Sequence, residues 1–163
     1  MEEELVKLLI ENNLKVSTAE SCTGGLIAAK IVSVASASKV FDVSFVTYAN
    51  EAKVKYLGVD EQTIKKFGVV SEEVTKEMAL GLVKETKANL ALVTSGIAGP
   101  TGGSDKKPVG MVCFGICLNE EAYTSTVYFG NIGRNNVREK ASNYIIEEAI
   151  KLLKAYSATG VKK

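Results

Sequence analysis

A short polar segment carries the side chains of this chain that best suit nucleophilic chemistry. Residues 18–25 read Thr-Ala-Glu-Ser-Cys-Thr-Gly-Gly and lie between two apolar runs, the second of which can begin a helix. At such a strand-to-helix turn, small side chains leave backbone N–H groups available to an anion or a developing oxyanion. Ser21 is therefore a candidate nucleophile, and Thr23, Gly24 and Gly25 are candidate substrate contacts. The alternative is a structural helix start, with Ser21 or Thr23 as its N-cap.

Histidine is absent from all 163 residues, so a hydroxyl nucleophile needs another base. Its absence excludes Ser-His-Asp and Cys-His catalysis and histidine-bound metal. Lys53, near the end of a predicted strand, is the plausible base for Ser21. An ordinary lysine with a pKa of ~10.4 is neutral in about one molecule in 2,500 at pH 7, whereas burial that lowers the pKa to ~7–8 makes roughly 10–50% neutral. The alternative for Lys53 is a solvated side chain on a short helix.

The three cysteines allow a second nucleophile but favour no metal site. Cys22 lies beside Ser21 and could be activated by a helix N-terminus, yet it has no histidine partner, and burial as a small apolar side chain is the favoured interpretation. Cys113 and Cys117 are four residues apart on a predicted strand, so they share one face and are expected in the core. An odd number without a C-x-x-C pair argues for a reducing cytoplasm and against a disulfide framework or a zinc site.

Two further features could contact a phosphorylated substrate. The loop at residues 95–105 is rich in glycine, but it lacks the Walker G-K-[ST] and Rossmann G-x-G-x-x-G patterns, so it indicates only a turn that can approach a ligand closely. Arg134 and Arg138 lie one helical turn apart near the start of a predicted helix. They could grip a phosphate if they face a pocket or be solvated if they do not, and the sequence leaves both interpretations open.

The periodicity of apolar residues predicts a single α/β domain over residues 1–163, with a frayed tail from about residue 158. Helices are expected at 2–12, 24–34, 50–57, 59–68, 71–86 and 134–156, and strands at 14–18, 40–47, 90–94, 109–118 and 122–129. The order indicates a three-layer α/β/α sandwich with a mixed, mainly parallel sheet and a late antiparallel hairpin. Ser21, Tyr48 with Lys53, and the loop at 95–103 each follow a strand, so they should meet at one sheet edge. The long last helix, which is amphipathic, predicts a homo-oligomer, dimeric or trimeric.

The composition is that of an ordinary globular protein, with 46% apolar and 24% charged residues. Twenty basic and 19 acidic residues leave a net charge of +1, which offers no case for nucleic-acid binding. No apolar run approaches the ~20 residues of a membrane span, and the glutamates at 2–4 have the wrong charge for a signal peptide. We therefore expect a cytoplasmic protein with neither a nucleic-acid nor a membrane partner.

Five stretches, taken together, match the pattern of one family. They are Thr-Ala-Glu-Ser-Cys-Thr-Gly-Gly at 18–25, Val-Thr-Tyr-Ala-Asn-Glu-Ala-Lys at 46–53, Gly-Val-Val-Ser at 68–71, Ser-Gly-Ile-Ala-Gly-Pro-Thr-Gly-Gly at 95–103 and Lys-Pro-Val-Gly at 107–110. In this order and spacing, over residues 4–156, the chain resembles the CinA C-terminal domain family. Each stretch alone would be weak evidence, but the set is highly specific.

The resemblance implies an activity and roles for several residues. The family includes nicotinamide mononucleotide (NMN) deamidases, which hydrolyse NMN to nicotinate mononucleotide and ammonia in pyridine nucleotide salvage. By resemblance, Ser21 would be the nucleophile, Lys53 its base and Tyr48 a supporting hydroxyl. The expected substrate contacts are Ser95, Gly96, Gly99, Arg134 and Arg138, of which Arg138 matches the family's binding arginine. No metal or organic cofactor is implied, and the partner would be the small-molecule nucleotide.

One position departs from the family pattern. Members usually carry an acidic residue directly before the first of the two arginines, where this chain has Gly133. The departure keeps open a second hypothesis, a catalytically silent pyridine-nucleotide-binding module that acts as a scaffold or regulator. A third, a DNA-associated competence factor, rests on the family's name and is opposed by the near-neutral charge. The resemblance does not extend to the N-terminal molybdopterin-binding-like domain of full-length CinA proteins, so the function of that domain is not expected of these residues.

Overall fold

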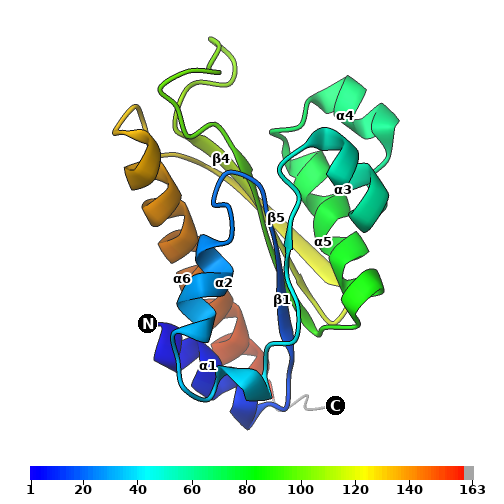
Figure 1. The fold of residues 1–163 in the computed structure, drawn as a ribbon. Helices are drawn as coiled ribbons and strands as arrows, with labels where there is room; N and C mark the ends of the chain where they lie inside the picture. Colours follow the sequence, from blue (N-terminus) through cyan, green and yellow to red (C-terminus); the bar gives the residue numbers. More distant parts are fainter. Residues whose placement is uncertain (160–163) are drawn as a thin grey trace.

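The computed structural model describes residues 1–159 as alternating helices and strands (Figure 1). In chain order the elements are α1 (Glu2–Glu11), β1 (Val16–Glu20), α2 (Leu26–Val32), the 3-10 turn η1 (Ala37–Lys39), β2 (Phe45–Val46), α3 (Asn50–Leu57), α4 (Glu61–Phe67), α5 (Glu72–Thr86), β3 (Leu90–Gly96), β4 (Met111–Leu118), β5 (Glu121–Tyr128) and α6 (Arg134–Ala158). No helix within this described part combines the length and apolar character needed to cross a membrane.

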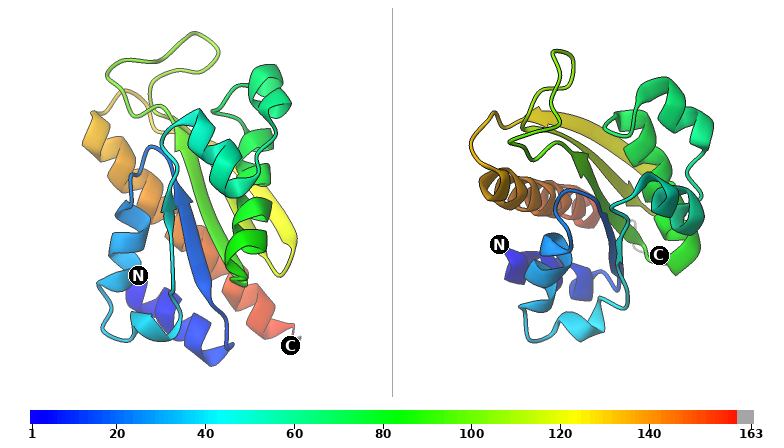
Figure 2. Two further views of the ribbon diagram at one scale, coloured as in Figure 1. Left: turned by 45° about the vertical axis from the view of Figure 1, so that its right-hand side comes forward. Right: turned by 45° about the horizontal axis from the view of Figure 1, so that its top comes forward.

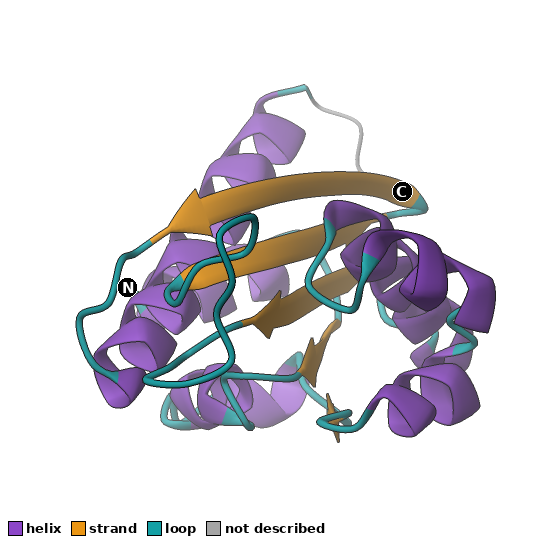
Figure 3. Cartoon of the chain, turned by 90° about the horizontal axis from the view of Figure 1, so that it is seen from above, coloured by secondary structure: helices purple, strands orange, loops and turns teal. Residues whose placement is uncertain are grey.

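The strands form one mixed sheet in the order β2-β1-β3-β4-β5. β1 lies parallel to both β2 and β3, whereas β3–β4 and β4–β5 are antiparallel pairs. Four strands therefore run in the same direction and only β4 is reversed, which confirms the predicted α/β fold with a parallel beginning and an antiparallel hairpin at the end. β1 and β3 both end at the edge shown from above in Figure 3, and the loops that follow them gather there.

Helices cover both faces of the sheet, so the predicted three layers are present. α1, α2 and α6 lie on one face, while α3, α4 and α5 lie on the other (Figures 1 and 2). The side chains of each strand alternate between the two sides. Leu92 and Phe114 join the core under α1, α2 and α6, and Val93 and Cys117 join the core under α3 and α5. Every residue of β4 is buried, as expected of a central strand.

The strand expected over residues 40–47 is wrong in length, because β2 has only two residues. Backbone pairing beside β1 begins at a bridge between Val16 and Phe41, and side-chain hydroxyls take its place between that bridge and β2. The Ser17 hydroxyl donates to the carbonyl of Val43 at 2.6 Å, and the Thr18 N–H donates to the Ser44 hydroxyl at 3.0 Å. Serine at both positions lets side chains compete with backbone pairing, an effect that apolar periodicity does not record.

The turn after β1 also shifts two predicted boundaries. β1 runs to residue 20 instead of 18, which leaves Ser21 directly after the strand, and α2 begins at Leu26 instead of Gly24. Gly24 and Gly25 have φ values of +59° and +98°, a left-handed conformation that glycine adopts without a Cβ penalty. These two glycines therefore belong to the turn, and the helix starts after them.

The last helix is longer than its periodicity predicts. α6 continues through Ala158, and the N–H of Thr159 donates to the carbonyl of Ala155 at 3.2 Å. Two residues of the expected frayed tail, Ala158 and Thr159, are the last residue of this helix and its C-cap, and the remainder, residues 160–163, lies outside the described residues.

Candidate active site

Ser21 lies where β1 ends, one residue before the chain turns toward α2. Its N–H donates to the carbonyl of Thr94 on β3 at 3.2 Å, so the hydroxyl is carried on backbone fixed to the centre of the sheet. The residue is 9% exposed and lines a cavity at this edge. The N-cap of α2 is Gly25, with no side-chain cap, so neither Ser21 nor Thr23 is the N-cap that the structural alternative predicts.

The buried carboxylate of Glu20, which the sequence analysis did not identify, stabilises this turn through hydrogen bonds. Glu20 is fully buried, and it accepts hydrogen bonds from two hydroxyls and three backbone N–H groups. The donors are Thr18 Oγ1 (2.9 Å), Thr23 Oγ1 (2.7 Å), Gly25 N (3.2 Å), Ile27 N (2.9 Å) and Ala28 N (3.0 Å). The side chain therefore satisfies the N-terminal donors of α2 and interacts favourably with the helix dipole. The position of Glu20, an acidic residue shortly before a predicted helix, was the sequence signal that could have identified this role.

The occupancy of these donors corrects one expectation. N–H groups at the start of α2 are not available to a substrate anion, because Glu20 already accepts from them. Within residues 1–159, the backbone N–H groups of Cys22 and Thr23 are the ones in this turn that donate to no acceptor on another residue. Cys22 lines the cavity and directly follows the candidate nucleophile, whereas Thr23 is fully buried and does not line it. The N–H of Cys22 is therefore the group in this turn that is available to an oxyanion.

Arg138 clamps the same turn from α6. Its Nε donates to the carbonyl of Cys22 and its Nη2 to the carbonyl of Thr23, both at 3.0 Å, while Nη1 donates to Asn135 Oδ1. The guanidinium also lies 3.3 Å from the place that a Cβ on Gly24 would occupy. Arg138 is absent from the lining of the cavity, so this structure places it behind the turn.

Lys53 extends from α3 to the Ser21 hydroxyl, and its side chain is fully buried. Its Nζ lies 3.3 Å from Ser21 Oγ and donates to the carbonyls of Thr47 at 2.7 Å and Tyr48 at 3.4 Å. Carbonyl oxygens only accept, so a neutral amine would use its two N–H groups on them and present its lone pair to the Ser21 hydroxyl. This geometry matches what a general base requires.

Burial lowers the pKa of Lys53 to about 8, because an ammonium loses hydration in this site. A thiolate at Cys22 would oppose the shift, but burial raises the pKa of that thiol to about 11. Cys22 is therefore a neutral thiol near pH 7 and a poor nucleophile. Cys113 and Cys117 are buried in the sheet, as their spacing predicts, and burial raises the pKa of each.

Tyr48 and Arg134 form the rim of the site. Tyr48 is 60% exposed, and its hydroxyl accepts a hydrogen bond from Arg134 Nη2 at 2.9 Å. Arg134 Nη1 donates to the carbonyl of Gly99 at 2.9 Å. The guanidinium thus links the segment before α3 to the loop after β3 across the mouth of the cavity. The Tyr48 hydroxyl is directed to this arginine, while the Tyr48 carbonyl faces Lys53.

The cavity has a volume of about 280 Å³. Seven of the residues expected at the site line it: Ser21, Tyr48, Lys53, Ser95, Gly96, Gly99 and Arg134. Thr23, Gly24, Gly25 and Arg138 do not line it and instead build the turn that carries Ser21. Asn50 and Val70 also contribute to the wall, although only their place in the matched stretches could have indicated this. The Ser95 hydroxyl donates to the carbonyl of Val69 at 2.9 Å, which fixes that wall to β3.

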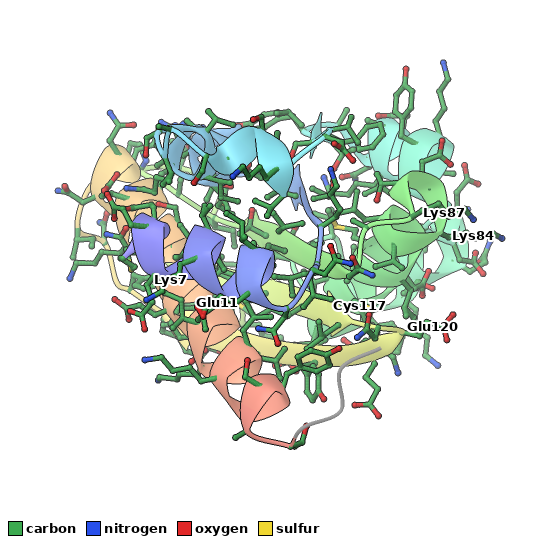
Figure 4. All side chains as sticks on the ribbon, turned by 90° about the horizontal axis from the view of Figure 1, so that it is seen from below. Lys7, Glu11, Lys84, Lys87, Cys117 and Glu120 are labelled. Carbon is green, nitrogen blue, oxygen red and sulfur yellow. The ribbon has the colours of Figure 1, made fainter. Side chains whose placement is uncertain are left out.

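A larger cavity, of about 1230 Å³, lies at the opposite end of the sheet. Lys84, Lys87, Cys117 and Glu120 are part of its lining and are labelled in the view from below (Figure 4). None of the residues expected at the site contributes to it. The smaller cavity, which holds a hydroxyl and a buried amine in contact, is therefore the better candidate for catalysis.

Comparison with known proteins assigns the family. The model of the CinA C-terminal domain matches residues 1–156. The chain belongs to this family. The CinA-like protein of Kosmotoga olearia is 48% identical over 147 residues, which cover 90% of this chain. The match covers 35% of that protein, so the chain spans about a third of the length of such relatives.

Solved structures of the CinA superfamily have the same fold. The competence/damage inducible protein CihA from Agrobacterium tumefaciens is 42% identical with a TM-score of 0.87, over 93% of this chain and 94% of that one. A CinA superfamily protein from Klebsiella pneumoniae is 30% identical with a TM-score of 0.91, over 94% of this chain and 96% of that one. The similarity covers nearly the whole of each protein, so the mixed sheet of this chain is the fold of the superfamily.

Proposed function

We propose that this CinA C-terminal domain hydrolyses the carboxamide of a pyridine nucleotide, converting NMN to nicotinate mononucleotide and ammonia. The supporting observation is the contact between the Lys53 amine and the Ser21 hydroxyl, 3.3 Å apart, with the pKa of Lys53 lowered to about 8. A lysine with that pKa is neutral in about one tenth of molecules at pH 7. The choice of NMN rests on the resemblance to a family that includes NMN deamidases.

The reaction would proceed through an acyl-serine. Ser21 Oγ attacks the amide carbon while its proton passes to Lys53 Nζ. The C–N bond of the tetrahedral intermediate then breaks, and the Lys53 ammonium returns the proton to the departing nitrogen, so that ammonia leaves. Next, Lys53 takes a proton from a water molecule as the water oxygen attacks the acyl carbon. Departure of the serine oxygen, which regains the proton, releases the carboxylate and restores Ser21.

The developing oxyanion would bind to the N–H group of Cys22, a residue that lines the cavity. In a planar trans peptide the C=O and N–H point in opposite directions. The carbonyl of Ser21 accepts a hydrogen bond from the Gly24 N–H at 3.0 Å, and this fixes the direction of the Cys22 N–H on the other side of that peptide. Arg138 holds the carbonyls of the next two residues, Cys22 and Thr23. Glu20 secures the other end of the turn through α2. In this proposal Glu20 and Arg138 are positioning residues, since neither lines the cavity.

The nucleotide phosphate would bind near Arg134. This guanidinium lines the cavity and is only partly used by Tyr48 and Gly99. A guanidinium presents five N–H donors, so donors remain for a phosphate. Arg138 remains the resemblance-based candidate for the same role, and kinetics of the two variants distinguish them. We also propose a cytoplasmic location, since the three cysteines are unpaired.

Ammonia release from NMN by the purified protein tests the proposal. We expect turnover by the wild type, and loss of it in Ser21→Ala, which removes one oxygen and leaves the turn intact. Nicotinamide riboside lacks the phosphate of NMN, and nicotinamide lacks both the ribose and the phosphate. Both should be hydrolysed more slowly than NMN. A wild-type rate no higher than that of Ser21→Ala would refute the proposal. Saturable NMN binding without ammonia would then support the silent binding module.

A further inference from the structure

β5 forms an open edge of the sheet. Within the described residues it pairs with β4 alone, and no further strand follows it in the sheet order. It is eight residues long, whereas the strand at the other edge, β2, has two. A long edge strand presents a row of unpaired backbone groups to any other extended chain. The outer edge of β5 is therefore a candidate site for pairing with another strand.

The hairpin geometry identifies the backbone groups that face outward. Leu118 and Glu121 pair across a turn of two residues, so they form a hydrogen-bonded pair. Since hydrogen-bonding direction alternates along a strand, residues 121, 123, 125 and 127 bond to β4. The N–H and C=O groups that point away from the sheet then belong to Ala122, Thr124, Thr126 and Tyr128. Among the described residues these groups have no backbone partner.

The sequence of β5 lacks the features that protect an edge strand. Glu-Ala-Tyr-Thr-Ser-Thr-Val-Tyr contains no proline, glycine or lysine, and its one charge is at the first position. Tyr123 and Tyr128 are 45% and 63% exposed, so large apolar surface lies at both ends of the edge. Proteins that keep such an edge unpaired usually carry lysine, proline or a bulge on it. The pattern is that of a strand that pairs with another strand.

Side chains of the two flanking helices, α5 and α6, already form hydrogen bonds with β5 in the single chain. Glu72 on α5 accepts hydrogen bonds from the hydroxyls of Thr124 and Thr126, both at 2.7 Å. On the other face, the Tyr144 hydroxyl of α6 donates to the Ser125 hydroxyl at 3.1 Å. Both flanking helices thus fix the centre of the strand. A preordered edge loses little conformational freedom when it pairs, which favours association.

We propose that β5 pairs antiparallel with β5 of a second copy of this chain, and that a two-fold axis passes through Ser125. This register is the one that uses all the outward-facing groups, because Thr124 then opposes the partner's Thr126 and Ala122 opposes the partner's Tyr128. Tyr123 would lie opposite the partner's Val127, an aromatic and β-branched pair that stabilises sheets. No charged residue lies within the paired stretch. The two sheets would become one continuous sheet.

The register predicts a specific crosslink. On the axis, the two copies of Ser125 form a non-hydrogen-bonded pair with Cα atoms ~4.5 Å apart, within the range of a disulfide. Ser125→Cys should therefore form a covalent dimer on mild oxidation. Tyr123→Cys is the matched control on the same face, because its two copies would be separated by roughly four residues, or ~13 Å. The native cysteines are buried and should not contribute.

The mass in solution provides an independent test. By light scattering, the wild type should have twice the chain mass of 17.4 kDa. Thr124→Pro should be a monomer, since proline removes an outward N–H and no bond to β4, whereas Thr124→Val keeps that N–H and should remain a dimer. The proposal is overturned by a monomeric wild type, by a Thr124→Pro dimer, or by equal crosslinking of the Ser125→Cys and Tyr123→Cys proteins.

Discussion

The titration of Lys53 should set the pH dependence of amide hydrolysis. With its pKa at about 8, Lys53 is neutral in about one tenth of molecules at pH 7 and in about nine tenths at pH 9. The rate constant kcat/KM reports the free enzyme, so it should rise about tenfold over this interval and level off above it. An ordinary lysine would instead give a rate that still increases tenfold per pH unit near pH 9.

The same group should affect stability, in a direction that follows from proton counting. The pKa of Lys53 is 10.5 in an ordinary environment and about 8 in the folded chain. Between these values the unfolded chain binds a proton that the folded chain has lost, so the free energy of unfolding rises with pH. The total rise is about 3 kcal/mol, and it ends above pH ~10.5. Below pH ~8 both states bind the proton, and the full penalty of burying the ammonium is present.

Ammonia release from NMN at saturating and limiting substrate, measured from pH 6 to pH 10, tests the kinetic prediction. Cys22→Ala should leave the apparent pKa unchanged, because the thiol titrates near pH 11. Lys53→Arg should abolish the rising limb, since an arginine remains charged throughout. Urea unfolding of the wild type and Lys53→Met across the same range tests the stability prediction, and only the wild type should gain stability above pH 8. A kcat/KM that is constant with pH, or a titration shared by Lys53→Arg, would contradict the reasoning.

Two further predictions concern the residues that hold the turn. Glu20→Gln should lower the free energy of unfolding by about 2–4 kcal/mol, because an amide places N–H donors among buried N–H donors. Urea unfolding measures this loss, and a change within experimental error would contradict the prediction. Arg134→Ala should raise KM for NMN about tenfold with little change in kcat, whereas Arg138→Met should mainly lower kcat, because Arg138 orients the turn without lining the cavity. If steady-state kinetics instead show that Arg138→Met raises KM and Arg134→Ala lowers kcat, the phosphate binds to Arg138.

Local sequence was sufficient to predict the α/β fold and to name Ser21 and Lys53 as candidates, and the resemblance to the CinA family joined them as a pair. The absence of histidine excluded the common bases, and apolar periodicity placed Ser21 in the turn after one strand and Lys53 on the short helix after the next. Parallel strands share their carboxyl edge, so their meeting followed from topology alone. Periodicity failed at β2, where hydroxyls of Ser17 and Ser44 replace backbone pairing, because such bonds depend on which strand lies alongside.

The sequence by itself determined which chemical groups were available and at which edge of the sheet they would lie. The tertiary structure decided which of them remain available to a substrate. Glu20 takes the donors of α2, Arg138 turns to the carbonyls of Cys22 and Thr23, and burial alone lowers the pKa of Lys53. Each outcome depends on contacts between segments far apart in the chain or on exclusion of water. Neither the contacts nor the exclusion of water is encoded in the local pattern of residues, because both arise only when the helices pack on the sheet.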